Sequence, residues 1–259
     1  MASAVGRRLF AGQVVSVALV TGGGGGIGRA IALRLAAAGH DVAVIDRDGA
    51  LGAETARLVE GAGRTALFLA ADVSSPAEVA AFVAETEGQL GPIDLFANNA
   101  GIEGAVAPIF DYPDDAFDAV MAVNVRGVFL GLKHVLARMR PRGRGAVVTT
   151  ASTSAIRGRP GLAGYVASKH AVLGLTRVAA LDVAGTAIRV NAVLPGPVDT
   201  RMIHALDEKA AAAGGIRRAG TATYGTPEDV AAVVAFLLSP EAAHVNGAAW
   251  TVDAGATVP

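Results

Sequence analysis

VSVALVTGGGGGIGRAIALRLAAA, residues 15–38, is the stretch on which the fold of this chain depends. It joins a β-branched apolar run (15–20) to a glycine-rich turn (21–28) and an Ala-rich helical pattern (27–38). Glycine adopts positive φ and lets the backbone approach a ligand closely, and the start of the helix offers unpaired N–H groups to phosphates. We interpret the stretch as a buried strand, a phosphate-binding turn and a helix. A merely flexible turn is the alternative.

The same alternation of strand and helix continues along the chain. Short apolar runs predict strands over residues 15–20, 42–45, 66–70, 95–97, 145–150, 188–193 and 248–252. Helical patterns lie near residues 27–38, 49–61, 76–90, 116–139, 164–183 and 227–238. Continuous apolar strands that alternate with helices predict a doubly wound α/β fold, with a parallel sheet covered on both faces.

We find no internal repeat, linker or break in composition, so we expect a single domain over residues 1–259. The longest segment without a clear strand is 197–226, which contains Gly214, Gly215 and Gly220. Loops of this length are commonly functional, and we expect this one to be a mobile segment that covers the substrate. A surface helix with frayed ends is the alternative.

Composition narrows the classes of function. Hydrophobic residues make up 52% of the chain and the formal net charge is −1, with a basic run only at 138–144, so no nucleic-acid partner is predicted. The absence of cysteine excludes disulfides, thiolate zinc sites and thiol catalysis, and no metal site is predicted. No apolar run is expected to be long enough to span a bilayer, and the apolar stretch before residue 21 lacks a cleavage-like site. We expect a soluble, cytoplasmic protein without a membrane partner.

A tyrosine and a lysine stand four residues apart at Tyr165 and Lys169, and Ser152 lies thirteen positions before the tyrosine. Residues spaced by four share one face of a helix. A cation beside a phenol favours the phenolate and lowers its pKa from about 10. Such a phenol can exchange a proton with a substrate hydroxyl. The alternatives are that Tyr165 is a core residue and that Ser152 only caps a turn.

Asp46 lies at the end of the second predicted strand, eighteen residues after Gly28. A carboxylate at this place accepts hydrogen bonds from both hydroxyls of an adenosine ribose and repels a 2′-phosphate. The neighbouring Arg47 could pair with that phosphate, but the glycine turn contains no basic residue to assist it. NAD is therefore favoured over NADP. A cap for the helix that begins near Gly49 is the alternative role of Asp46.

Together these residues resemble the short-chain dehydrogenase/reductase family over nearly the whole chain. The matching positions occur in the family's order and at its approximate spacings: residues 21–28, Asp72, Val73, Asn98, Asn99, Ala100, Gly101, Asn124, Ser152, Tyr165, Lys169, Pro195 and Gly196. The resemblance implies a Rossmann-type sheet of seven parallel strands, usually in a homotetramer. The implied cofactor-binding residues are Gly22, Gly25, Gly26, Ile27, Gly28, Asp46, Asp72, Val73, Asn99, Tyr165, Lys169, Pro195, Gly196, Val198 and Thr200.

The resemblance also implies the catalytic roles. Tyr165 would exchange the substrate proton while hydride passes between the substrate carbon and the nicotinamide. Lys169 would lower the pKa of the phenol and hold the nicotinamide ribose, and Ser152 would hydrogen-bond the substrate oxygen. Asn124 would anchor a water that links the lysine to solvent. A single polar position on a helix is the alternative for Asn124, and a plain turn is the alternative for Asn98–Gly101.

The chain departs from the family pattern in three places. Residues 14–17 add length between an entry turn at 10–12 and the first strand. Thr223 stands where many members carry a basic residue, and His170, after Lys169, stands where a small apolar residue is more usual. None of these changes touches the expected chemistry.

The leading hypothesis is an NAD-dependent oxidoreductase for a secondary alcohol or its ketone, such as a cyclic alcohol, diol or diketone. Apolar residues expected around the pocket, with Glu103 the lone charge, indicate a compact substrate without a phosphate or carboxylate clamp. These apolar residues are Ala151, Ile156, Leu162, Pro195 and Met202. The alternatives are an NADPH-dependent 3-oxoacyl reductase and a catalytically inactive dinucleotide-binding regulator or scaffold.

Overall fold

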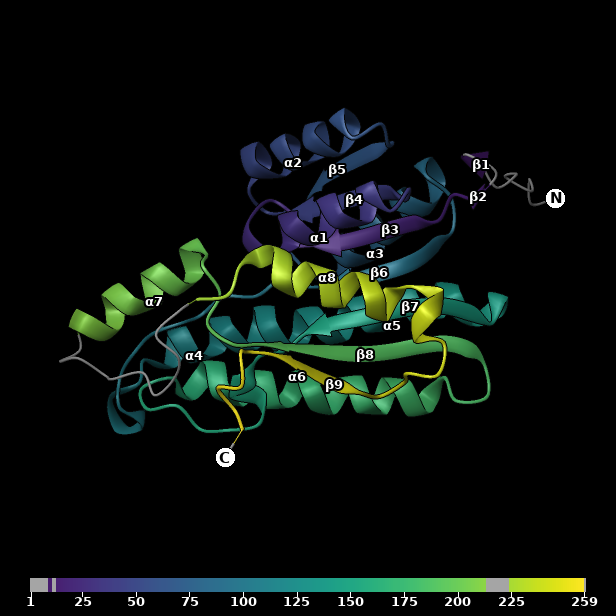
Figure 1. The fold of residues 1–259 in the computed structure, drawn as a ribbon. Coiled ribbons are helices and arrows are strands. Elements are labelled where there is room, and N and C mark those ends of the chain that lie inside the picture. The colour runs from purple at the N-terminus through teal and green to yellow at the C-terminus, as the bar shows by residue number, and fades with distance from the viewer. Residues whose placement is uncertain (1–8, 11–12, 213–223, 259) are drawn as a thin grey trace.

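The centre of the molecule is a seven-stranded sheet in the order β5-β4-β3-β6-β7-β8-β9, and every neighbouring pair in it is parallel (Figure 1). Its strands are β3 (Val17–Thr21), β4 (Asp41–Asp46), β5 (Ala66–Ala70), β6 (Ile93–Asn98), β7 (Arg144–Thr150), β8 (Ala187–Pro195) and β9 (Ala249–Val252). The structure, a computed structural model, describes residues 9–10, 13–212 and 224–258. The predicted Rossmann-type fold is confirmed. The strand order reverses between β3 and β6, and a sheet of this kind binds ligands beyond the carboxyl ends of the strands at that point.

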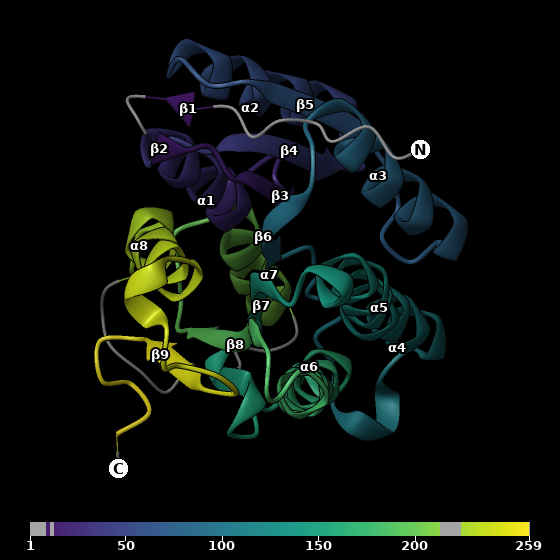
Figure 2. The same cartoon turned by 90° about the vertical axis from the view of Figure 1, so that its right-hand side faces the viewer.

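Helices cover both faces of the sheet (Figure 2). On one face lie α1 (Gly26–Ala37), α2 (Gly49–Gly61) and α8 (Pro227–Leu238), and on the other lie α3 (Pro76–Gln89), α5 (Val128–Met139) and α6 (Ala163–Asp182). Successive strand residues point to opposite faces, so Ala18 and Val20 of β3 join the core under α1 and α8, whereas Leu19 joins the core under α3, α5 and α6. All of β3 is buried, as its continuous apolar sequence predicted.

Three helices begin where the sequence supplies a cap. Asp48 accepts hydrogen bonds from the N–H groups of Ala50 and Leu51 at the start of α2, and Ser75 caps α3. Thr226 and Asp229 form a reciprocal capping box at the start of α8. Such caps satisfy N–H groups that have no partner within the helix. The observed bounds of α2 and α8 therefore match the predicted ones.

The helix predicted over 116–139 consists of three parts: α4 (Asp114–Val120), the π-helical segment η2 (Met121–Gly127) and α5. The short 3-10 turn η3 (Arg140–Arg142) follows them. By length and composition the 29-residue stretch Asp114–Arg142 is long and apolar enough to cross a membrane, which corrects the expectation that no run is long enough. Its buried side chains pack in the core on the sheet.

The segment 197–226 contains a helix, α7 (Arg201–Ala212), that the strand and helix patterns did not single out. Its two ends meet in a parallel bridge between Val198 and Gly225. The predicted glycines at 214, 215 and 220, and Thr223, lie outside the described residues.

Before β3, β1 (Leu9–Phe10) and β2 (Gln13–Val14) form a small antiparallel pair. The added residues 14–17 therefore run from β2 into β3, and residues 11–12 of the entry turn lie outside the described part. The remaining 3-10 turns are η1 (Ile109–Asp111), η4 (Thr153–Ala155) and η5 (Pro240–Ala242).

Candidate active site

A cavity of about 570 Å³ opens at the carboxyl ends of the central strands. Every sequence-predicted site residue except Asn124 lines it: Gly22, Gly25, Gly26, Ile27, Gly28, Asp46, Asp72, Val73, Asn99, Ser152, Tyr165, Lys169, Pro195, Gly196, Val198 and Thr200. These residues come from the ends of β3, β4, β6, β7 and β8, from the loop after β5 and from α6. The sheet topology therefore gathers positions that are up to 178 residues apart in the chain, from Gly22 to Thr200.

The glycine-rich turn forms one end of the cavity. Gly22 has φ +64°, and a Cβ at Gly28 would lie 1.9 Å from the carbonyl oxygen of Gly22, so neither position tolerates a side chain. The residue before α1, Gly25, makes no side-chain cap, in contrast to the caps of α2, α3 and α8. A Cβ at Gly25 would meet only Arg201 Nη2, at 3.9 Å, among the described residues. The first turn of α1 thus presents unpaired N–H groups to the cavity.

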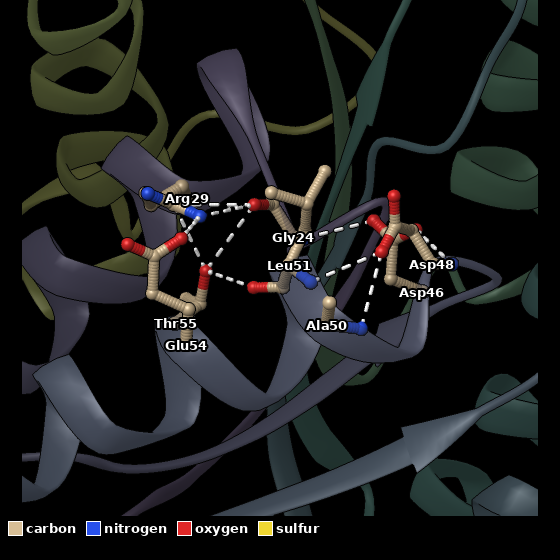
Figure 3. Close-up of polar contacts among 8 residues, drawn as sticks. All are labelled: Gly24, Arg29, Asp46, Asp48, Ala50, Leu51, Glu54 and Thr55. Carbon is tan, nitrogen blue, oxygen red and sulfur yellow. Dashed lines mark hydrogen bonds and ion pairs between the residues drawn. The ribbon is translucent and has the colours of Figure 1, made fainter.

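An arginine on α1 braces this turn from behind (Figure 3). Arg29 donates to the carbonyl oxygen of Gly24 from Nε at 3.1 Å and from Nη2 at 2.8 Å. The same guanidinium bonds Thr55 Oγ1 at 3.0 Å and Glu54 Oε2 at 2.5 Å, both on α2. Sequence reasoning missed this brace, because its partners lie about 25 residues away and no local pattern marks them.

Asp46 contacts the other side of the turn and does not cap α2. Its Oδ2 accepts from Gly24 N at 2.8 Å and its Oδ1 accepts from Asp48 N at 2.9 Å (Figure 3). The cap of α2 is Asp48, so the alternative role considered for Asp46 is wrong. In the part of the chain that the structure describes, Asp46 forms no ion pair, and the neighbouring Arg47 is exposed. Among these residues, the negative charge of Asp46 therefore faces the cavity without a cationic partner.

Asn99 spans the point where the strand order reverses. Its N–H donates to Thr21 Oγ1 at 2.9 Å and its Nδ2 donates to Thr21 O at 3.1 Å. Its Oδ1 accepts from Thr150 Oγ1 at 3.0 Å. The side chain thus ties the ends of β3, β6 and β7 together, which fixes the floor of the cavity. Thr21 and Thr150 were not predicted as site residues.

The remaining predicted cofactor residues form the two flanks of the cavity. Asp72 is exposed and accepts hydrogen bonds from Ser74 N and Oγ, both at 2.8 Å, while Val73 is buried. On the opposite flank, Pro195, Gly196, Val198 and Thr200 lead from β8 into α7. Arg201, which follows Thr200 directly, also lines the cavity and was not predicted.

Ser152, Tyr165 and Lys169 meet deep in the same cavity. Ser152 follows β7, and its hydroxyl hydrogen-bonds the Tyr165 phenol and accepts from Ser154 N at 3.1 Å. Lys169 is buried one helical turn after Tyr165 on α6, and its Nζ lies 5.5 Å from the centroid of the phenol ring. The ammonium donates to Thr150 O at 2.8 Å, which fixes its position. The next residue, His170, is exposed and turns its Nδ1 to Val166 O, away from this group.

Burial shifts the pKa values of both groups toward their neutral forms. It raises the pKa of Tyr165, which the hydrogen bond from Ser152 and the charge of Arg159 lower and the charge of Glu103 raises again. Burial lowers the pKa of Lys169 to about 8. The expectation of a phenol with a lowered pKa is therefore not met in this arrangement. The cost of burying a phenolate exceeds what its neighbours return.

Asn124 lies behind the cavity, fully buried in the π-helical segment η2. Its Oδ1 accepts from Ile102 N at 2.8 Å, and its Nδ2 donates to Ile102 O at 2.9 Å and to Ser168 Oγ at 3.0 Å. Ser168 precedes Lys169, so Asn124 connects the loop after β6 to the helix that carries Tyr165 and Lys169. All three hydrogen bonds hold residues next to the site, so Asn124 is more than an ordinary polar position on a helix.

The substrate end of the cavity carries more charge than the sequence indicated. Ala151, Leu162, Pro195 and Met202 line it as expected, but Ile156 does not line it and is 48% exposed. Arg157 and Arg159 line it together with Glu103. The expectation of Glu103 as the lone charge was wrong, because the loop before α6 turns both arginines toward the cavity.

The geometry fits a nicotinamide dinucleotide. The uncapped start of α1 and the open backbone at Gly25 suit a pyrophosphate, and the carboxylate of Asp46 suits ribose hydroxyls. Ser152, Tyr165 and Lys169 stand at the far end of the same cavity, where a reacting substrate would meet the cofactor. The cavity can therefore bring cofactor and proton-transfer group together.

The known proteins that are similar to this chain are reductases and dehydrogenases. The family model described as enoyl-(acyl carrier protein) reductase matches residues 22–257. Levodione reductase of Leifsonia aquatica is 43% identical over 248 residues, covering 92% of this chain and 93% of that protein. A short-chain dehydrogenase/reductase of Armillaria gallica is 40% identical, with 92% and 95% covered. The 2,5-dichloro-2,5-cyclohexadiene-1,4-diol dehydrogenase of Sphingobium indicum is 38% identical, with 92% and 96% covered.

Two solved structures with the same fold contain different cofactors, one NAD⁺ and the other NADPH. NAD⁺-bound xylitol dehydrogenase superimposes with a TM-score of 0.87 at 35% identity, covering 92% of this chain and 97% of that one. A point variant of actinorhodin polyketide ketoreductase with NADPH gives a TM-score of 0.90 at 36% identity, with 95% and 98% covered.

Proposed function

Because the chain belongs to the short-chain dehydrogenase/reductase family, we propose that it is an NAD-dependent enzyme that interconverts a secondary alcohol and its ketone. The observation that carries this proposal is the convergence of Ser152, Tyr165 and Lys169 in the cavity that also contains the glycine-rich turn and Asp46. Membership of the family makes the chain an oxidoreductase. The substrate, the cofactor preference and the residue roles are the proposed part.

In this mechanism Tyr165 holds the proton that is exchanged with the substrate oxygen. It accepts the hydroxyl proton during alcohol oxidation and returns it during ketone reduction. Ser152 hydrogen-bonds both the phenol and the substrate oxygen, and so orients the two for transfer. Lys169, held by Thr150 O, stabilises the phenolate that forms when the proton leaves. A bound nicotinamide dinucleotide supplies the hydride acceptor or donor.

We propose NAD as the cofactor because of the charge near the ribose site. Asp46 is fixed by Gly24 N and Asp48 N and has no ion-pair partner in the described part of the chain. A carboxylate that already accepts two N–H bonds keeps lone pairs free for two ribose hydroxyls. A 2′-phosphate would meet the same negative charge, and two such groups repel. Arg47 is exposed, so it would have to be ordered to offset that repulsion.

A compact cyclic alcohol, diol or diketone is the proposed substrate class. Apolar lining by Ala151, Leu162 and Met202 supports it, as does the similarity to levodione reductase and to a cyclohexadiene-diol dehydrogenase. The similarity to a polyketide ketoreductase supports 3-oxoacyl reduction as a second candidate. A panel of cyclic ketones and 3-oxoacyl thioesters with both cofactors separates the two. We expect the higher kcat/KM for a cyclic ketone.

Replacement of Tyr165 by Phe tests the catalytic assignment. It removes one oxygen from a partly buried ring, so we expect the fold to survive and turnover to fall by about 100- to 10,000-fold. Tyr224→Phe is the matched control, because it removes the same atom from an exposed tyrosine outside the cavity lining, where the hydroxyl bonds Asp207 of α7 and, among the described residues, no group of the site. It should keep turnover within about twofold of wild type. Undiminished turnover by Tyr165→Phe would refute the mechanism, and a wild type that binds NAD without turnover on any panel member would indicate the inactive binding protein instead.

We also propose a cytoplasmic homotetramer built from one domain per chain. Large apolar side chains remain exposed on the helices of one face: Phe117, Phe129, Val178 and Leu181. Trp250, 38% exposed on the edge strand β9, packs against Phe236 of α8 and offers a second apolar contact surface. Exposed apolar surface of this extent is typical of subunit contacts.

A further inference from the structure

The peptide unit between Gly24 and Gly25 has the cavity on one side and helices α1 and α2 on the other. Gly25 lines the cavity, whereas Gly24 does not. The bond is trans, so the carbonyl group of Gly24 and the N–H group of Gly25 point in opposite directions. The carbonyl accepts a hydrogen bond from Arg29 of α1, and the N–H is therefore directed to the cavity. In the part of the chain that the structure describes, this N–H forms no hydrogen bond.

The local sequence does not fix this orientation. Both residues are glycines, and a peptide unit between residues without a Cβ rotates at little steric cost. A rotated unit would turn the carbonyl oxygen of Gly24 toward the cavity. The partial negative charge of that oxygen would repel a phosphate, where the N–H of Gly25 would donate to it. The orientation that suits a pyrophosphate therefore depends on contacts from elsewhere in the chain.

One residue of α1 supplies these contacts by holding two consecutive carbonyl groups. The Arg29 guanidinium donates to Gly24 O from Nε at 3.1 Å and from Nη2 at 2.8 Å (Figure 3). The backbone N–H of Arg29 donates to Gly25 O at 3.2 Å. Arg29 therefore fixes two peptide units, whose own N–H groups, on Gly25 and Gly26, point the opposite way. Donation to a carbonyl also polarises its peptide unit and makes the N–H a stronger donor.

Helix α2 holds the guanidinium in turn. Glu54 Oε2 accepts from Arg29 Nη2 at 2.5 Å, and Thr55 Oγ1 accepts from Arg29 Nε at 3.0 Å. Thr55 is fully buried, and its hydroxyl lies 3.4 Å from Gly24 O. The side chains of Arg29 and Glu54 are 25% and 43% exposed. Because Glu54 neutralises the guanidinium, we infer that Arg29 acts on the turn through the direction of its hydrogen bonds and not through a net charge.

Gly24 is held at its other end by the carboxylate proposed for the ribose. Asp46 Oδ2 accepts from Gly24 N at 2.8 Å. A Cβ at Gly24 would lie 2.8 Å from the same oxygen and 3.1 Å from Leu51 Cβ, so Gly24 is closely packed as well as hydrogen-bonded. Asp46 has a second contact, from Asp48 N at 2.9 Å, that does not involve the turn. Loss of Arg29 should therefore release the pyrophosphate side of Gly24 and leave the ribose side in place.

We propose that Arg29 is a positioning residue for the cofactor, which holds the Gly24–Gly25 peptide unit so that the N–H of Gly25 is offered to the pyrophosphate. The inference rests on the proposed function and deepens it, because it assigns part of the cofactor affinity to a residue outside the cavity lining. Arg29 acts through the glycine turn and takes no part in the transfer of hydride or proton.

The test measures binding and so does not depend on turnover. ADP-ribose contains the pyrophosphate and adenosine does not, and the Kd of each is measured by calorimetry. Arg29→Met removes every donor of the guanidinium and should raise Kd for ADP-ribose about tenfold, the scale of one hydrogen bond to a charged group. Kd for adenosine should stay within about twofold of wild type. In turnover, KM for NAD should rise as Kd for ADP-ribose does, while kcat stays within about twofold.

Two further variants separate position from charge. Glu54→Gln removes a negative charge near the turn but loosens the guanidinium. Positioning predicts that Kd for ADP-ribose rises about two- to threefold, whereas attraction between Arg29 and the pyrophosphate at a distance predicts that it falls. Arg29→Lys keeps the positive charge but cannot hold Gly24 O from two nitrogens. Its Kd for ADP-ribose should rise about threefold, whereas a purely electrostatic role predicts the wild-type value.

Arg34→Met and Glu60→Gln are the matched controls, because they make the same changes at exposed positions of α1 and α2 outside the cavity lining. Both should keep the wild-type Kd for both ligands. An unchanged Kd for ADP-ribose in Arg29→Met, an equal loss of adenosine affinity, or tighter binding by Glu54→Gln would overturn the inference. Arg29→Lys decides the question if Arg29→Met does not fold. A wild type that binds ADP-ribose but turns over no alcohol or ketone would contradict the proposed function, while the two ligands still decide the role of Arg29.

Discussion

Asp46 is the side chain on which the proposed cofactor preference rests. Its carboxylate is held by Gly24 N and Asp48 N and faces the cavity beside the glycine turn. We expect kcat/KM for NAD to exceed that for NADP by at least about tenfold, equivalent to about 1.4 kcal/mol. Asp46→Ala should narrow or reverse the preference, whereas Asp118→Ala, which removes an exposed carboxylate on α4 outside the cavity lining, should not. Equal values in the wild type, or a preference for NADP, would show that Arg47 dominates.

Lys169 links the site to stability. Its pKa is lowered by burial to about 8, from an ordinary value of 10.5. Between these two pH values the unfolded chain binds a proton that the folded protein has released, so the free energy of unfolding rises with pH. The full difference corresponds to roughly 3 kcal/mol. Tyr165, whose pKa burial raises, acts in the opposite direction only above about pH 10.

Lys169→Met should therefore flatten the dependence of unfolding free energy on pH between about 8 and 10. Urea unfolding of wild type and variant at several pH values measures the slope. Lys133→Met, which removes an exposed lysine, serves as the control and should keep the wild-type slope. The same slope in Lys169→Met as in wild type would mean that the buried ammonium does not titrate in this range.

At the level of elements, local sequence predicted most of the fold. The strands of the sheet lie within a few residues of their predicted bounds, because strand and helix periods differ and both faces of the sheet are apolar. The bounds of α2 and α8 match the predicted ones residue for residue, because the capping residues lie directly before these helices in the sequence. The gathering of the predicted residues in one cavity also follows from a parallel sheet, since its carboxyl ends meet at one edge.

The elements that were missed depend on contacts far along the chain. The π-helical segment η2 surrounds Asn124, whose bonds go to Ile102 and Ser168, 22 and 44 residues away. α7 was anticipated only by the alternative of a surface helix in segment 197–226, because its apolar face is directed to the cavity and not to the sheet. No periodic pattern in the sequence marks the contact of Arg29 with Glu54, or the approach of Arg157 and Arg159 to the cavity. The spacing of apolar residues predicts a helix or strand, but it does not predict which distant side chains will contact that element.

The whole molecule presents an unusual outer surface on α6. Its outward stripe carries the exposed His170 and Arg177, but also Ala167, Gly174, Val178 and Leu181, of which the last two are 57% and 75% exposed. A helix that faces only water rarely exposes large apolar side chains to this extent. Helix α6 lies on the same side of the molecule as α4 and α5 (Figure 2), and Phe117 of α4 and Phe129 of α5 are also exposed. We propose this face as the subunit contact, because exposed apolar patches mark interaction sites.

Val178→Asp tests whether this face holds an assembly together. In an assembled protein the new carboxylate would be buried in an apolar contact without a partner. The free-energy cost of burying that charge exceeds the free energy that one apolar residue contributes to association. We expect the wild type to sediment at about four times the chain mass of 25.9 kDa, and the variant to sediment as a smaller species with its far-ultraviolet spectrum unchanged. Leu58→Asp makes the same kind of change on α2, at a residue that is 45% exposed, and should leave the mass unaltered. A wild type that sediments as a monomer, or a Val178→Asp protein of undiminished mass, would show that the exposed face of α6 is not the surface through which the chains associate.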